Sequence, residues 1–176
     1  MKRFLIALAC AFLALETANA KDDNKTVNCS MQDNLQYCVD ENGKPITGKV
    51  AIKDENGMTK SLENLKNGYR NGLQTEFDEK GALFRRAYYD MGVLNGQYKL
   101  YHKNRQLKLL ANNKEGVLHG NSEIYDDQGN LIGKVLYNKG RVKSGYCRKD
   151  AKAKKKKLTF FEIQNFPDNY LITCGQ

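Results

Sequence analysis

Apolar and polar residues alternate through the middle of the chain. Leu107, Leu109 and Ala111 are one such run, in which every second side chain is apolar. Short polar clusters ending in glycine, such as DEKG (78–81) and DDQG (126–129), separate these runs. A period of two is typical of β-strands, and Asp followed by Gly is typical of tight turns. The pattern therefore predicts a series of β-hairpins.

The hairpin pattern recurs along the chain. Gly68, Gly92, Gly116 and Gly140 follow one another at intervals of 24 residues. Only 40% of residues are hydrophobic and the mean hydropathy is −0.69, which suits a sheet of one layer better than a thick core. We expect an all-β fold, a single twisted antiparallel sheet built from tandem hairpin repeats with disulfide-capped ends. The predicted units are 44-67, 68-91, 92-115, 116-139 and a partial unit, 140-146.

The repeat resembles a known family. The segment YDDQGNLIGKVLYNKG (125–140) contains an aromatic–Asp–x–x–Gly–x–Leu element followed by Tyr–x–x–Gly. This motif is similar to the MORN-repeat variant of bacterial proteins called YwqK-like antitoxins, and the resemblance covers about residues 44–146. It implies a hairpin array with an interaction role and no enzymatic activity.

The N-terminus has the three parts of a secretory signal peptide. A basic start, Met1-Lys2-Arg3, precedes an apolar stretch at 4–15 and the small residues Ala18 and Ala20. We expect residues 1-20 to be removed by cleavage after Ala20. The pattern predicts a bacterial protein that is periplasmic or secreted.

Four cysteines remain after the predicted cleavage. An oxidising compartment favours disulfides, and the ends of an eight-stranded array would lie about 35–40 Å apart. Because a disulfide needs Cα atoms within about 7 Å, we predict Cys29–Cys38 and Cys147–Cys174. The first bridge would close an N-terminal cap, 21-43. A zinc site is disfavoured because no cysteine or histidine pair has the usual ligand spacing.

The C-terminal part, 147-176, begins with a basic segment, RKDAKAKKKK (148–157), and we expect a final hairpin at 158–176. The basic segment either forms a solvated loop or binds an anionic membrane surface or envelope polymer. It lacks interleaved aromatic residues, which disfavours nucleic acid. Its cationic residues are Arg148, Lys149, Lys152, Lys154, Lys155, Lys156 and Lys157.

The sequence contains no pattern typical of catalysis. His102 and His119, the only histidines, occupy turn positions that carry Asp or Asn one interval away. No serine lies in a nucleophile-elbow pattern, and the glycines belong to the repeat rather than to a phosphate-binding loop. We therefore expect no enzyme, no cofactor and no metal.

The remaining hypothesis is an exported protein-binding scaffold. One version is an immunity protein that masks a toxin. The alternative is an envelope-associated structural protein that docks through 148–157. Aromatic residues that recur in the repeat would form the partner-binding face: Phe77, Tyr89, Tyr101, Tyr125 and Tyr137.

Overall fold

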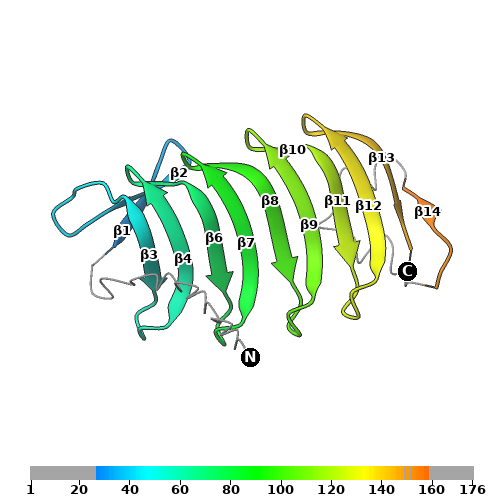
Figure 1. The fold of residues 1–176 in the computed structure, drawn as a ribbon, viewed down its shortest axis with the longest axis horizontal. Coiled ribbons are helices and arrows are strands. Elements are labelled where there is room, and N and C mark those ends of the chain that lie inside the picture. Colours follow the sequence, from blue (N-terminus) through cyan, green and yellow to red (C-terminus); the bar gives the residue numbers. More distant parts are fainter. Residues whose placement is uncertain (1–26, 149, 151, 159–176) are drawn as a thin grey trace, which may run out of the picture.

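The protein is an elongated antiparallel sheet (Figure 1). The computed structural model describes residues 27–148, 150 and 152–158, which form fourteen strands and no helix. This confirms the all-β, single-sheet prediction. The strands are β1 (Asn28–Gln32), β2 (Leu35–Val39), β3 (Gly48–Lys53), β4 (Thr59–Lys66), β5 (Tyr69–Arg70), β6 (Gly72–Phe77), β7 (Leu83–Asp90), β8 (Val93–Tyr101), β9 (Leu107–Lys114), β10 (Val117–Leu118), β11 (Gly120–Tyr125), β12 (Leu131–Asn138), β13 (Arg141–Cys147) and β14 (Lys156–Lys157).

From β6 onward the spatial order follows the chain. The order is β1-β2-β5-β4-β6-β7-β8-β9-β11-β12-β13-β14, with β10 beside β9 and β3 beside β4. Neighbouring strands are joined by short turns, so each pair forms from residues close in sequence. The turn at Asp78 is typical: its Oδ1 accepts hydrogen bonds from the N–H groups of Lys80 and Ala82, both at 2.9 Å. These bonds lower the pKa of Asp78. The turns at Asp54 and Asp126 contain the same two bonds.

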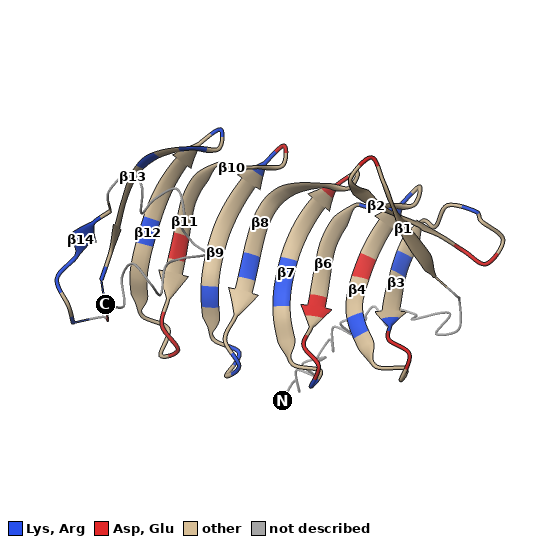
Figure 2. Cartoon of the chain, turned by 180° about the vertical axis from the view of Figure 1, so that it is seen from behind, with Lys and Arg blue, Asp and Glu red and all other residues tan. Residues whose placement is uncertain are grey.

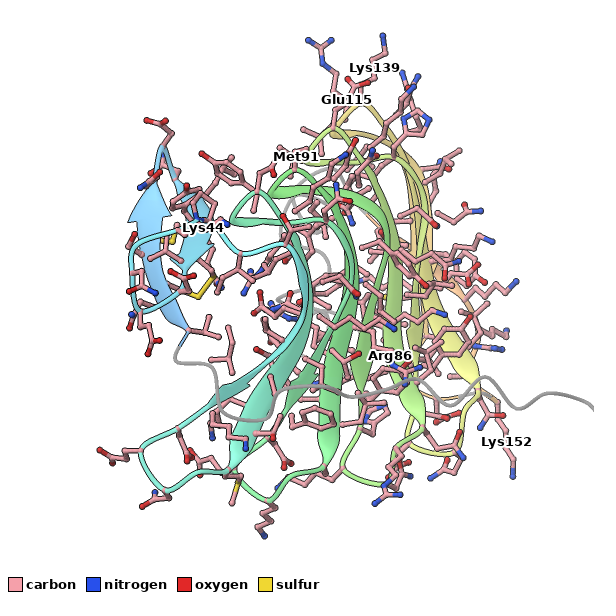
Figure 3. All side chains as sticks on the ribbon, turned by 60° about the vertical axis from the view of Figure 1, so that its left-hand side comes forward. Lys44, Arg86, Met91, Glu115, Lys139 and Lys152 are labelled. Carbon is pink, nitrogen blue, oxygen red and sulfur yellow. A yellow bond between two sulfur atoms is a disulfide. The ribbon has the colours of Figure 1, made fainter. Side chains whose placement is uncertain are left out.

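The sheet is curved and has two different faces (Figure 3). We call the face toward β1 and β2 the inner face, and the opposite one the outer face. Side chains alternate between them, and each cross-strand row stays on one face. An inner row runs Gln74, Ala87, Tyr98, Ala111. One outer row runs from Leu62 on β4 to Lys134 on β12, through Thr75, Arg86, Lys99, Leu110 and Glu123.

The N-terminal hairpin does not pair with the strand that follows it in the chain. β2 pairs with β5 through Tyr37 and Tyr69, while β3 pairs only with β4 among the described strands. Backbone hydrogen bonds hold β2 beside β5: Cys38 N–H donates to Gly68 O at 2.8 Å, and Gly68 N–H donates to Ile46 O at 2.8 Å. β1 and β2 consequently form an arm on the inner side of the sheet (Figure 3).

The N-terminal disulfide is confirmed. Cys29 lies directly opposite Cys38 in the β1–β2 pair, with Cα atoms 4.1 Å apart, and the two sulfurs are bonded. Cys147 is fully buried and is also disulfide-bonded. Its predicted partner, Cys174, lies outside the described residues. The predicted signal peptide, 1-20, and most of the predicted C-terminal hairpin also lie outside them.

Most buried apolar residues gather on the C-terminal half of the sheet. Val135 and Cys147 are fully buried at the centre of this cluster, and Tyr98, Leu100, Leu118 and Val142 pack against it. The other buried members are Leu109, Ile124, Ile132, Tyr137 and Leu158. The N-terminal half buries fewer apolar residues and several polar side chains, among them Ser61, Glu63 and Gln74. The two halves of the sheet are thus stabilised by different chemistry.

Candidate functional site

Three of the five predicted aromatic residues point to the outer face. The Tyr125 hydroxyl donates a hydrogen bond to Glu123 Oε2 at 2.7 Å, and Glu123 belongs to the outer row. Burial and this bond raise the pKa of Tyr125 to about 12. Phe77 and Tyr101 come directly after inner-face residues and so point outward as well. All three are half-buried near strand ends.

The other two predicted aromatic residues lie on the inner face. Tyr137 is only 5% exposed and belongs to the buried cluster. Tyr89 has the Arg70 guanidinium over its ring, 5.2 Å from the centroid. The five aromatic residues therefore do not form one face, because even and odd positions of a strand point to opposite sides.

The outward side of β7 carries two aromatic residues and a cation that are not among the predicted site residues. Phe84, Arg86 and Tyr88 alternate along the strand, and Phe84 and Tyr88 are 47% and 45% exposed. Leu62, in the same cross-strand row as Arg86, is 47% exposed. Lys99 lies directly opposite Arg86 on β8. We call Leu62, Phe84, Arg86, Tyr88 and Lys99 the β7 strip.

Tyr88 differs from the residues 24 positions away. Asn64 and Asn112 each donate a side-chain hydrogen bond to a backbone carbonyl on the neighbouring strand, of Leu73 and Asn121 respectively. Each of the three residues also lies against a glycine: Asn64 against Gly72, Tyr88 against Gly96 and Asn112 against Gly120, with an added Cβ at Gly96 lying 3.0 Å from Tyr88 Cβ. An aromatic ring therefore replaces a side chain that ties strands together, and much of that ring remains exposed to solvent.

Phe84 also differs from its counterparts. The residues 24 positions before and after it are Lys60 and Lys108. A lysine side chain can cover the sheet with its methylene groups while its ammonium group stays hydrated. A phenyl ring has no polar group to hydrate, so its exposure to solvent is unfavourable and is typical of an interaction surface. The sequence signal for this strip is the alternation within 83–90, which puts Phe84, Arg86 and Tyr88 on the side opposite Ala87 and Tyr89.

The β7 strip has excess positive charge. Lys and Arg lie side by side on β7, β8 and β9 (Figure 2). Arg86 and Lys99 form no ion pair with any residue that the structure describes. Farther along the same row, Lys134 Nζ lies 2.8 Å from Glu123 Oε1, and this hydrogen bond lowers the pKa of Glu123. In the outer row, the positive charge at β11–β12 is thus paired with a carboxylate, whereas the positive charges at β7–β8 are not.

On the inner face, charges are paired within the molecule. Glu63 is 2% exposed and receives two hydrogen bonds of 3.0 Å from Arg70, and one each from Ser61 and Gln74. Gln36 Nε2, from the arm, donates a further bond of 3.3 Å to its Oε2. Burial opposes the charge of Arg70, but the bonds and charge of Glu63 outweigh it and raise the pKa of Arg70. This network attaches the arm to the sheet.

A second inner-face pair lies one row away. Arg85 pairs with Glu76, and its guanidinium lies 5.7 Å from the centroid of the Tyr98 ring. Burial disfavours the charge of Arg85, yet Glu76 and Tyr98 raise its pKa above the ordinary value. Both arginines of this part of the inner face, Arg70 and Arg85, therefore have a carboxylate partner within the molecule.

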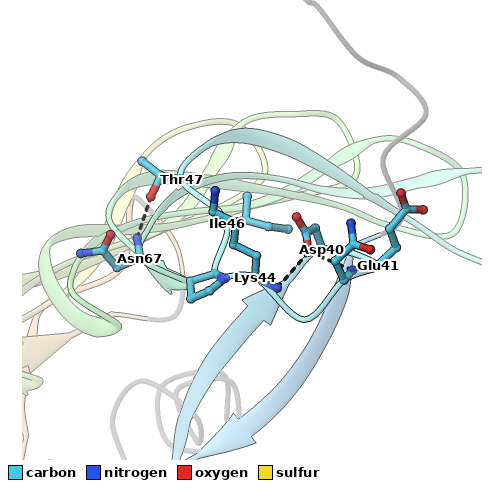
Figure 4. A pocket seen from close by; sticks show the side chains of 8 residues that line it. Asp40, Glu41, Lys44, Ile46, Thr47 and Asn67 are labelled. Atoms are coloured by element: carbon cyan, nitrogen blue, oxygen red, sulfur yellow. Dashed lines mark hydrogen bonds between the residues drawn. The ribbon is translucent and has the colours of Figure 1, made fainter.

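Two hollows are shallow. A groove of about 230 Å³ lies on the inner face beside the apolar cluster. It is lined by Leu94, Tyr98, Leu100, Leu109, Ala111, Asn113 and Leu118. A wider hollow lies at the loop after β2 (Figure 4), but its polar groups hold the loop itself: Asp40 Oδ1 accepts from the N–H groups of Asn42 and Lys44, and Thr47 Oγ1 accepts from Asn67 N–H.

Two described cations of the basic segment contact other parts of the chain. Arg148 donates to Leu131 O, and Lys155 lies over the Tyr146 ring at 4.4 Å. The segment was expected to be a loop, but Lys156 and Lys157 form β14, which pairs with β13. Lysines on an edge strand discourage pairing with further chains. Lys152 and Lys154 are exposed, and Lys149 lies outside the described residues.

Both histidines bond to neighbouring hairpins. His102 Nε2 lies 2.9 Å from Tyr125 O, and Lys139 N–H donates to His119 Nδ1 at 3.4 Å. Within the described ranges, no group of three or more His, Cys, Asp or Glu residues is placed to hold a metal ion. The same part of the chain has no helix with the length and hydrophobicity needed to span a membrane.

The chain matches no protein-family model and no curated protein.

Proposed function

We propose that this protein is an exported, non-catalytic scaffold that binds a protein partner through the β7 strip. The observation that carries the proposal is the outward side of β7, where Phe84 and Tyr88, each nearly half exposed, flank Arg86. Aromatic residues and Arg are enriched at the centres of protein interfaces, where they contribute most of the binding energy. A β-strand with neighbours on both sides presents them with little conformational freedom to lose.

Two further observations support this proposal. The Cys29–Cys38 disulfide is typical of an oxidising compartment, as the predicted signal peptide implies. The MORN-like motif implies an interaction role, with a toxin-masking immunity protein as one version. The two hollows described above are shallow and open, which suits a broad macromolecular contact better than an enclosed substrate.

The test is a selection of peptides from a random displayed library on the oxidised protein without residues 1-20. We expect selected peptides to lose affinity about tenfold or more when Phe84 and Tyr88 are both replaced by Ala. Leu136→Ala is the matched control, because Leu136 is 40% exposed on β12, 48 positions after Tyr88, and binding should persist. Peptides that bind the double variant as well as the wild type would refute the proposal.

A further inference from the structure

We infer that the partner of the β7 strip presents carboxylate groups, so that an acidic protein segment with apolar neighbours binds across β7 and β8. The inference rests on the proposed function and specifies the chemistry of its partner. It starts from the register of the sheet, which places Arg86 directly opposite Lys99 on the outer face.

Two like charges directly opposite each other destabilise an antiparallel pair, because their Cβ atoms lie only about 5 Å apart. The surrounding row does not relieve this repulsion. The cross-strand neighbours of the two cations are Thr75 and Leu110, which carry no charge. The next carboxylate in the row, Glu123, is occupied by Lys134 and the Tyr125 hydroxyl.

Three other strand cations have a carboxylate partner within the molecule. Arg70 and Arg85 on the inner face pair with Glu63 and Glu76, and Lys134 on the outer face pairs with Glu123. Arg86 instead faces another cation, Lys99, and lies on β7 between two exposed aromatic rings. Carboxylates supplied by a partner would remove the repulsion and gain charge-assisted hydrogen bonds, with a bidentate geometry available at the Arg86 guanidinium.

The surroundings favour a protein over a lipid surface or a nucleic acid. Exposed apolar side chains, Phe84, Tyr88 and Leu62, lie beside the two cations, and the neighbours of the two cations in their row, Thr75 and Leu110, are uncharged. Binding to a phosphate backbone or an anionic membrane grows with the number of cations engaged. A short acidic segment with apolar residues beside its carboxylates would match both the cations and the exposed apolar side chains of the β7 strip.

Peptides are selected on the wild-type protein, and their affinity for the wild type is compared with their affinity for three variants. We expect Asp and Glu beside apolar residues to be enriched, and affinity to fall about tenfold for Arg86→Gln/Lys99→Gln, which removes two charge-assisted contacts. Lys49→Gln/Lys53→Gln, on exposed positions of β3, removes the same charge elsewhere and should leave binding unchanged. Lys99→Glu should also lose binding while raising the thermal midpoint, because it converts the repulsion into attraction. Such a result cannot arise from misfolding.

Other outcomes overturn the inference. Selected peptides without an acidic excess, which still require Phe84 and Tyr88, would refute the acidic partner and leave the proposed scaffold intact. Peptides indifferent to both aromatic residues would refute the scaffold itself. Phosphatidylglycerol vesicles or polyphosphate that bind as tightly as the peptides, with the same loss for Arg86→Gln/Lys99→Gln, would show that the strip recognises anions in general.

Discussion

At the scale of single residues, Gly68 is where the arm meets the sheet. Its φ is +84°, and a Cβ added there would lie 2.4 Å from Tyr37 Cε2. Tyr37 also packs against Tyr69, with ring centroids 5.0 Å apart. The close approach of the ring to the backbone depends on the absence of a side chain.

We predict that Gly68→Ala destabilises the protein by about 2–3 kcal/mol, because it combines backbone strain with displacement of the Tyr37 ring. Gly57→Ala is the control: its φ is +78°, but nothing lies within 4 Å of the added Cβ, so only the backbone term of about 1 kcal/mol remains. Urea unfolding of both variants measures the difference. Equal losses would show that the contact with Tyr37 has no energetic role.

At the scale of elements, the arm is attached through polar contacts as well as through the Tyr37–Tyr69 ring contact. β1 is exposed along its whole length, while Gln36 on β2 reaches the buried Glu63 on β4. Glu63 is therefore shared by β2, β4, β5 and β6, and its carboxylate compensates the partly buried Arg70. A buried pair of this kind is costly to break because one charge would remain without a partner.

We predict that Glu63→Ala costs about 3–5 kcal/mol, since it leaves the partly buried Arg70 without its counter-charge. Glu123→Ala breaks a pair whose Lys134 side chain is 35% exposed, and should cost about 1 kcal/mol or less. Chemical denaturation of the two variants gives the comparison. A loss at Glu63 no greater than that at Glu123 would contradict the structural role of the network.

At the scale of the whole molecule, a sheet of one layer has few contacts between distant strands. Each strand packs mainly on its sequence neighbours, and the apolar cluster lies at β9–β13 while the polar network lies at β2–β6. Local opening at one end should therefore leave the other end folded.

We predict that Cys29→Ser/Cys38→Ser loosens the arm without unfolding the rest. Amide hydrogen exchange should accelerate at β1, β2 and β5 and stay unchanged at β8–β12, because the bridge closes a loop within the arm alone. Uniform acceleration along the sheet would show instead that the molecule unfolds as a single cooperative unit.

Several features could be predicted from the sequence because they are local. The alternation at Leu107, Leu109 and Ala111 and the Asp-to-Gly turns indicated hairpins, and Cys29 and Cys38 are close enough in sequence to face each other across one turn. The aromatic set was less successful. Its members were chosen by interval alone, and the parity of each position within its strand sends Tyr89 and Tyr137 to the face opposite Tyr125.

The sequence by itself determined the strands, their turns and which side chains share a strand face, since alternation and turn chemistry act over a few residues. Only the tertiary structure decided that β2 pairs with β5 and that Gln36 meets Glu63. It also decided that Arg86 faces Lys99. These outcomes depend on cross-strand register and on competition among distant strands for the same edge. Shifting the register by one residue would give each side chain new neighbours without changing any local pattern.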